Sequence, residues 1–158
     1  MPTPSFPSAP VSEQRAGTWI AEHDPLPTVL WPVDDGFDPH GRYVETYWLP
    51  VLGPASVVAF RRLNARLDAR PSGLAFDLGD LAHSLGLGRS TARNSPIVRT
   101  LHRLEQFGLA RVDHGTYAVR RTAPALTRRQ ADRLPAHLIG EHRRDLVAIG
   151  RARLAQAV

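Results

Sequence analysis

Arginine is the residue type in this sequence that is best placed to do chemistry. All 20 basic residues are arginine and none is lysine, a preference that a GC-rich genome explains most simply. Genome composition does not, however, explain how the charges are distributed along the chain. Residues 1–52 carry two arginines and seven acidic residues, a net charge of −5, whereas residues 53–158 carry 18 arginines and eight acidic residues, a net charge of +10. Such an asymmetry is expected where one part of a protein meets a polyanion.

The densest group of candidate binding residues surrounds the start of a predicted helix. The polar segment that precedes this helix provides four candidate phosphate contacts, Arg89, Ser90, Arg93 and Ser95. Exposed N–H groups and the positive end of the helix dipole favour anions at such a position. Within the helix, Arg99 and Arg103 lie one turn apart on the polar face, and each guanidinium group can bind guanine through two hydrogen bonds.

Four further residues complete the candidate site. His102 and Gln106 share the polar face of the same helix, and a glutamine side chain can pair with adenine. Arg120 and Arg121 follow a predicted hairpin, from which they could reach a neighbouring backbone or minor groove. The alternative for each of these ten residues is an ordinary solvated side chain on an exposed surface.

Motifs for catalysis or metal binding are missing from the sequence. The seven histidines form neither His-Glu-x-x-His nor a pair four residues apart, and without cysteine there is no thiolate ligand or disulfide. The glycines at 86 and 88 lack the third glycine of a dinucleotide-binding turn. The acidic cluster at 34–38 is typical of a solvated loop, and His142, on an apolar stripe, of a satisfied core or interface residue. We therefore expect no enzyme, no cofactor and no metal.

Three helices and a hairpin are predicted to hold the arginines in place. Helical spacing of apolar residues, helix-capping residues, glycines at helix ends and alternation in the strands define these elements. In chain order they are a helix from Pro54 to about Leu67, a short strand at Leu74–Phe76, a helix at Leu78–Leu85 capped by Asp77, a helix at Pro96–Phe107 capped by Ser95 and ended by Gly108, and strands at Leu109–Asp113 and Thr116–Arg120 joined by His114-Gly115.

The two flanking segments differ from this central part. The first 40 residues hold eight of the 14 prolines, so we expect neither regular helix nor central strand there, and disorder in residues 1–15. Residues 16–52 hold all three tryptophans and two of the three tyrosines, which predicts an extended arm docked on the domain, with a short helix at about Tyr43–Leu49. The alternative is an arm that binds a partner or exchanges in a dimer.

The C-terminal segment, residues 122–158, is predicted to be helical. Thr127 and Gln130 match a capping box, and Pro135 interrupts or restarts the helix that it opens. The apolar residues of Ala136–Leu154 lie in a single stripe. This helix either packs on its own domain or pairs with the same helix of a second copy, and a homodimer is the expectation.

A family resemblance supports this order of elements. Leu81-Ala82 with Leu85-Gly86, then Leu101, Arg103-Leu104-Glu105 and Gly108-Leu109, resemble the "LA..LG" and "L.RLE..GL" motifs of the winged helix-turn-helix transcription-regulator superfamily. The resemblance covers residues 54–121. It implies a winged helix domain at 53–121, in a mainly α protein with a small β-hairpin, and it implies that the helix Pro96–Phe107 enters the major groove. About five extra residues after Gly86 depart from the family pattern and leave base-specific reading open.

These observations together predict a double-stranded DNA-binding protein, a transcription regulator or an initiator or architectural factor. The first ten residues lack the features of an export signal and no apolar run reaches membrane length, so the cytoplasm of a bacterium is the expected location. One alternative is a winged-helix module that binds another protein through the aromatic arm and the wing. RNA or ribosome binding shares the electrostatics, but the sequence lacks an aromatic RNA-binding sheet motif.

Overall fold

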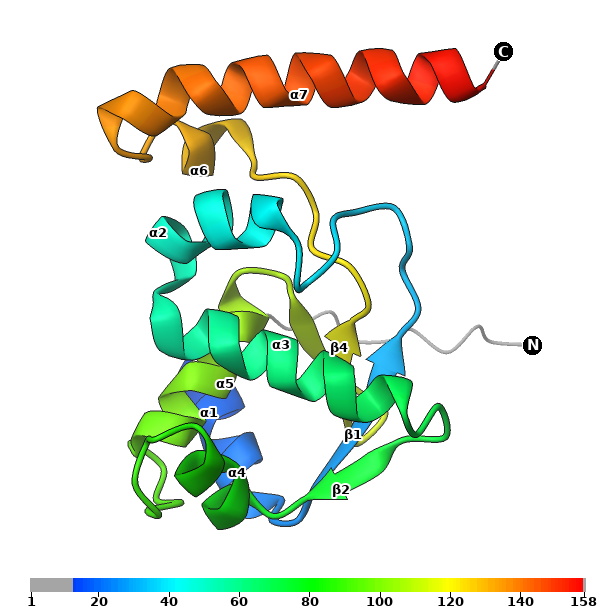
Figure 1. The fold of residues 1–158 in the computed structure, drawn as a ribbon. Helices are drawn as coiled ribbons and strands as arrows, with labels where there is room; N and C mark the ends of the chain where they lie inside the picture. The colour runs from blue at the N-terminus through cyan, green and yellow to red at the C-terminus, as the bar shows by residue number, and fades with distance from the viewer. Residues whose placement is uncertain (1–12, 158) are drawn as a thin grey trace, which may run out of the picture.

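The computed structural model describes residues 13–157 and shows, within them, a mixed fold of seven α-helices, one π-helix and a four-stranded sheet (Figure 1). The elements are α1 (Glu13–Glu22), β1 (Leu26–Trp31), η1 (Val44–Trp48), α2 (Leu49–Leu52), α3 (Pro54–Asp68), β2 (Leu74–Phe76), α4 (Leu78–Ser84), α5 (Pro96–Gln106), β3 (Ala110–Asp113), β4 (Thr116–Arg120), α6 (Arg128–Ala131) and α7 (Ala136–Gln156). The expected α+β composition is thereby confirmed. Across these residues no helix is both long enough and apolar enough to cross a membrane.

The sheet has the strand order β2-β1-β4-β3. β3 and β4 form an antiparallel hairpin whose turn is His114-Gly115, and both turn residues have positive φ. β1 lies between the hairpin and β2: it runs parallel to β4, from Thr28 opposite Tyr117, and antiparallel to β2. A segment far upstream in the sequence thus provides a central strand between two strands that belong to the predicted domain.

The expectation that the first 40 residues hold no regular helix and no central strand is therefore wrong. The prolines fall at residues 2–10 and 25–39 and leave an interval in which α1 forms, and the first turn of α1 includes residues 13–15, which were expected to be disordered. The rest of that expected disordered segment lies outside the described residues. Within β1, Pro27 precedes the pairing with β4, so its missing N–H falls where the strand has only one neighbour.

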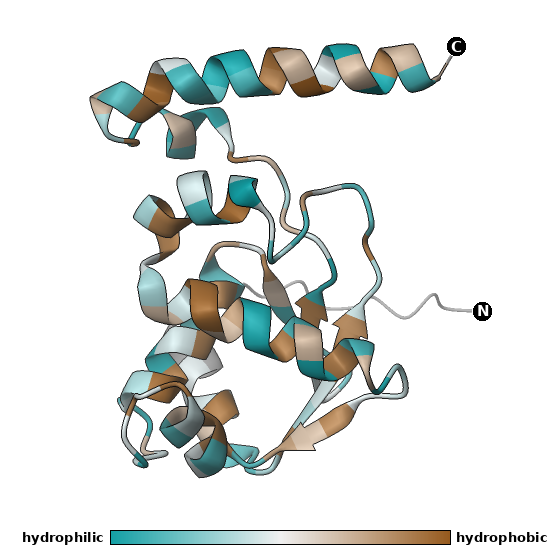
Figure 2. Ribbon diagram, viewed as in Figure 1, coloured by the Kyte–Doolittle hydropathy of each residue, from teal (hydrophilic) through white to brown (hydrophobic). Residues whose placement is uncertain are grey.

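The core lies between one face of the sheet and the helices α3 and α5. α3 crosses this face, and Figure 2 shows apolar residues gathered where the two meet. Side chains that are fully buried here include Phe60 and Leu63 of α3, Leu101 and Leu104 of α5, and Tyr117 of β4. Burial of each such side chain stabilises the fold by about 1.5–3 kcal/mol.

Helix boundaries follow the capping chemistry of the sequence. The side chain of Asp77 accepts a hydrogen bond from the Asp80 N–H at 2.8 Å, as predicted for the start of α4. α5 begins with Pro96 after its cap residue, and Gly108 with φ +75° follows its end. The predicted capping box is present at the start of α6, where Thr127 is the cap residue.

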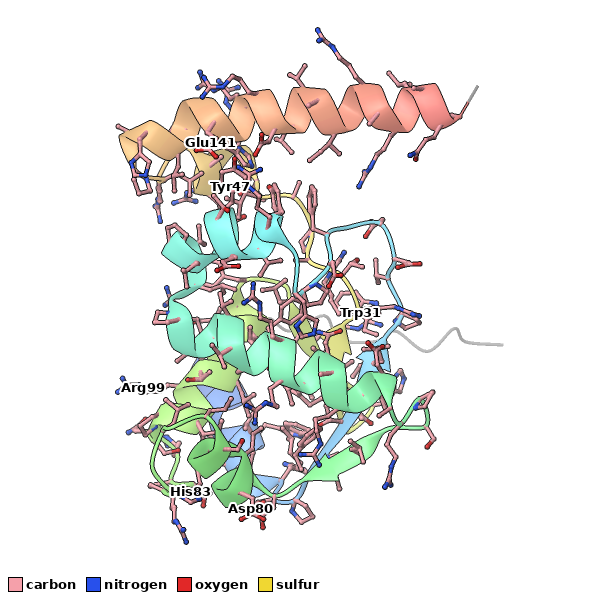
Figure 3. All side chains as sticks on the ribbon, in the orientation of Figure 1. Trp31, Tyr47, Asp80, His83, Arg99 and Glu141 are labelled. Atoms are coloured by element: carbon pink, nitrogen blue, oxygen red, sulfur yellow. The ribbon has the colours of Figure 1, made fainter. Side chains whose placement is uncertain are left out.

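α7 lies across one end of the molecule, over η1 and α2 (Figure 1). The Tyr43 hydroxyl lies 2.7 Å from Nε2 of the buried His142. The Tyr47 hydroxyl donates to a carboxylate oxygen of Asp145 at 2.5 Å, and Figure 3 shows Tyr47 between η1 and α7. These residues of the aromatic arm therefore attach α7 to the rest of the fold, and η1 with α2 occupies the place of the short helix expected near Tyr43–Leu49.

Candidate nucleic-acid interface

The candidate interface is built on the exposed ridge of α5. Ser95 caps this helix by accepting a hydrogen bond from the Val98 N–H, and the apolar side chains of Ile97, Leu101 and Leu104 anchor the opposite face in the core. This anchoring fixes the rotation of α5 and turns Arg99 outward. Figure 3 shows Arg99 pointing away from the body of the molecule.

Two grooves run along the sides of this ridge. The first has a volume of about 470 Å³ and lies between α5 and the junction of α2 with α3. The second, of about 290 Å³, lies between α5 and α1, and its walls include Gly17, Thr18 and Asn94. Three predicted site residues line both grooves: Arg99, His102 and Gln106. The structure therefore brings these three together as the crest that separates the grooves.

Arg103, the other predicted base reader, is held by the fold. Its Nε donates to the main-chain carbonyl of Leu52 at 2.7 Å, and its Nη2 donates to that of Val51 at 2.8 Å. The guanidinium group also lies 5.0 Å from the ring centroid of Phe107. Its charge still contributes to the first groove, but its hydrogen-bonding groups are turned toward the end of α2.

Two further predicted contacts are also engaged within the chain. The Ser95 side chain is buried at 5% exposure beneath the start of α5, so its hydroxyl is a helix cap. Arg120 is buried at 9% exposure, donates from Nε to the carbonyl of Thr122 at 2.9 Å and from Nη2 to Asp35 at 2.8 Å, and lies over the ring of Trp31. Neither side chain is presented to a ligand.

The remaining predicted residues lie on exposed loops. Arg93 lines the second groove beside the crest. Arg89 and Ser90 are exposed on the loop before α5, where Arg89 Nη2 lies 3.4 Å from Nδ1 of His83. Arg121 lies in a separate hollow, among the acidic side chains of Asp34, Asp38 and Asp68. The structure therefore groups Arg93 with the crest and sets Arg121 apart from it.

His102 and Glu105 form a partly buried pair at the base of the crest. His102 Nδ1 lies 3.6 Å from Glu105 Oε2, and neither atom has a hydrogen-bond partner. Burial raises the pKa of Glu105, while the neighbouring imidazole opposes that rise. The acidic side chain of α5 therefore faces His102 at the base of the crest.

The first turn of α3 also belongs to this surface, which its sequence did not predict. Gly53, Pro54, Ala55 and Ser56 line the first groove opposite Arg99. Their sequence signalled a helix start, which the structure confirms with Gly53 as the cap residue and Pro54 in the first turn. Only the packing of α3 against α5 brings that helix start to the groove.

Comparisons of this chain with protein-family models, with curated proteins and with solved structures find no match. The function must therefore be inferred from the arrangement of α5, its two grooves and the arginines around them.

Proposed function

We propose that this chain binds double-stranded DNA as a winged helix-turn-helix protein, with α3, α4 and α5 as its three helices and the β3–β4 hairpin as its wing. The main observation behind the proposal is the crest of α5, where Arg99 lies between two grooves. Arg99, His102 and Gln106 line both grooves. Transcription regulation, or an initiator or architectural role, is the corresponding biological function.

The diameter of α5 supports this proposal. An α-helix with its side chains is about 10–12 Å across, and the major groove of B-DNA is about 12 Å wide. With α5 in the major groove, the two phosphate backbones would run along its two sides, where the structure has grooves. Arg93 would then approach one backbone, and the N–H groups at the start of α3 the other.

The contacts of Arg103 support a smaller set of proposed base readers than the sequence suggested. Because Arg103 is bound to the carbonyls of α2, we assign Arg99 the role of principal base reader and Gln106 a secondary one. Arg93 and Arg89 are assigned to phosphate contacts, since both are exposed on the loop before α5. Ser95, Arg103, Arg120 and Arg121 are left out of the proposed contact set.

The alternative of a protein-binding module that uses a free aromatic arm has less support. Tyr43, Tyr47 and Trp48 have exposed fractions of 7%, 1% and 1%, and the Trp48 indole donates to the carbonyl of Pro124 at 2.8 Å. A partner that required these rings would have to displace core packing. Arg99, in contrast, is already exposed on the crest.

The test is a titration of labelled duplex DNA of mixed sequence, followed by fluorescence anisotropy at several salt concentrations. We expect wild-type affinity to fall steeply as salt rises, and Arg99→Ala and Arg93→Ala each to weaken binding by about fivefold to 100-fold. Arg128→Ala, which removes an exposed arginine of α6, is the matched control and should leave affinity nearly unchanged. The absence of salt-sensitive binding, or an equal loss in the Arg128 control, would disprove the proposal.

A further inference from the structure

The two long sides of α7 have very different surroundings. Its inner side holds both of its acidic residues: Glu141 accepts from Arg42 at 2.7 Å, and Asp145 accepts from Arg42 at 3.1 Å and from Tyr47. The buried His142 lies on the same side, next to Tyr43. The negative charges of α7 are therefore used to attach the helix to the rest of the chain.

Basic and apolar side chains alternate along the outer side of α7. Arg143, Val147, Arg151 and Leu154 follow one another at intervals of three or four residues, so they share one face of the helix. The exposed fractions of Val147 and Leu154 are 54% and 71%, the largest among the large apolar side chains of the described residues. Figure 2 shows brown, apolar segments alternating with teal ones along α7. Arg143, Arg144, Val147, Ala148 and Arg151 line a shallow groove of about 410 Å³.

Charge complementarity decides which partner fits this outer face. A second copy of α7 would place Arg143, Arg144 and Arg151 against the same three arginines, without an acidic residue on that face to offset them. A duplex or an anionic membrane would satisfy the arginines. A duplex would leave Val147 and Leu154 exposed between them, and interfacial membrane helices bind through a wider apolar face than these two side chains provide. A helix that carries carboxylates and apolar residues at the same spacing satisfies both.

We propose that the outer face of α7 docks an acidic amphipathic helix of another protein. In such a complex, Val147 and Leu154 pack against apolar side chains of the partner helix, as in helix–helix packing with 8–10 Å between the axes. The arginines on either side pair with carboxylates of that helix, and guanidinium groups suit such pairs because they can donate two parallel hydrogen bonds. This face is distinct from the crest of α5, so one chain can hold DNA and the acidic helix together.

The probe is a fluorescent 21-residue helical peptide with glutamate and leucine placed at complementary spacing, titrated with the full chain. A peptide of the same composition in scrambled order is the matched ligand control. We expect the patterned peptide to bind at least tenfold more tightly than the scrambled one. The double variant Arg144→Glu/Arg151→Glu should lose at least tenfold of that affinity, and Val147→Asp several-fold. Because these residues are exposed, thermal melting should be unchanged.

Two controls keep the test decisive. Arg128→Glu/Arg129→Glu makes the same change of net charge on exposed positions of α6 and should leave peptide binding intact, as should Arg99→Ala. Equal affinity for both peptides, or an equal loss in the α6 double variant, overturns the proposal. It is also overturned if the α7 arginines are needed instead for binding duplex DNA or phosphatidylglycerol vesicles, or for self-association in sedimentation.

Discussion

Nε of Arg103 donates a 2.7 Å hydrogen bond to the main-chain carbonyl of Leu52, across 51 positions of sequence. A second donation, from Nη2 to the carbonyl of Val51, makes the guanidinium group a bridge between α5 and the end of α2. This bridge holds one wall of the larger groove at a fixed distance from the crest. Arg103 is therefore bound within the fold, whereas Arg99, one turn away on the same helix, is exposed.

Replacement of each arginine by alanine should separate the structural role of Arg103 from the proposed DNA-binding role of Arg99. Arg103→Ala should lower the free energy of unfolding by about 1–3 kcal/mol, because two carbonyls lose their charged donor. Arg99→Ala should change it by less than about 0.5 kcal/mol, since this side chain is exposed, but should weaken DNA binding. Urea unfolding of the two variants, with wild type alongside, measures the difference. Equal stabilities would mean that the Arg103 bridge is not formed in solution.

Local signals account for what the sequence predicted well. Asp77, Thr127 and Gly108 act within one turn of their own helices, so their roles as caps and helix ends can be derived from neighbouring residues alone. The polar face of α5 was predicted in the same way. The engagement of Arg103 with α2 and of Arg120 with Asp35 depends on partners tens of residues away, and neither contact has a local signature.

Dependence on partners far away in the sequence also explains why β1 was not predicted. Residues 26–31 form a strand because β2 and β4 offer two edges with the right spacing, and the sheet order brings together segments nearly 90 residues apart. Proline content argued against such a strand, whereas in the structure Leu26 and Thr28 are buried and alternate with more exposed neighbours. Pairing partners of this kind are set by tertiary structure, which overrides local propensity.

The contact between Tyr43 and His142 predicts a pH-dependent stability. The Leu126 N–H donates to the Tyr43 hydroxyl, which leaves the hydroxyl proton for Nε2 of a neutral His142. Burial lowers the pKa of His142, while Asp145 opposes the shift with a smaller effect. A lowered histidine pKa means that the unfolded chain takes up the proton first, at about pH 6.5. The stabilisation is therefore complete above that pH and is lost as pH falls below it.

Melting temperatures at pH 7.5 and 5.5 measure this effect. Wild type should melt at a lower temperature at pH 5.5, and His142→Gln should show a smaller difference between the two pH values, because glutamine can accept the hydrogen bond without titrating. His137→Gln is the matched control at an exposed position of the same helix. If the His137 variant instead reduces the pH dependence as much as the His142 variant, the buried contact is not its source.

Gly36 should be intolerant of any side chain. A Cβ at this position would contact the backbone of Ala123, with the carbonyl carbon at 2.7 Å, and would lie 2.9 Å from Oγ1 of Thr122. The backbone there cannot shift freely, because Phe37 and Ala123 exchange hydrogen bonds of 2.6 and 2.8 Å. We expect Gly36→Ala to lower the free energy of unfolding by about 1–3 kcal/mol or more.

Gly150→Ala is the matched control for this substitution. A Cβ at Gly150 meets nothing within 4 Å, and the residue lies inside α7, where alanine is favoured over glycine by about 1 kcal/mol. Guanidinium chloride unfolding should therefore show opposite signs for the two glycine-to-alanine changes. Equal small effects would mean that the loop at Gly36 is free to move away from Ala123.

Arg120 and Asp35 should respond unequally to the loss of their ion pair. The side chain of Arg120 is only 11% exposed, whereas that of Asp35 is 75% exposed, so water can replace the carboxylate but not the buried guanidinium group. Arg120→Ala also removes the donor to the Thr122 carbonyl and leaves a cavity beside Trp31. We expect it to destabilise the fold by about 3 kcal/mol, and Asp35→Ala by less than about 1 kcal/mol.

The same pair of variants also tests which arginines belong to the proposed DNA-binding surface. Because Arg120 is bound within the chain, Asp35→Ala should leave the salt dependence of DNA binding close to that of wild type. The folded fraction of Arg120→Ala, measured at low temperature, should bind with wild-type affinity per folded molecule. A loss of affinity in the folded Arg120 variant as large as that of Arg99→Ala would return Arg120 to the contact set and extend the interface from α5 to the end of β4.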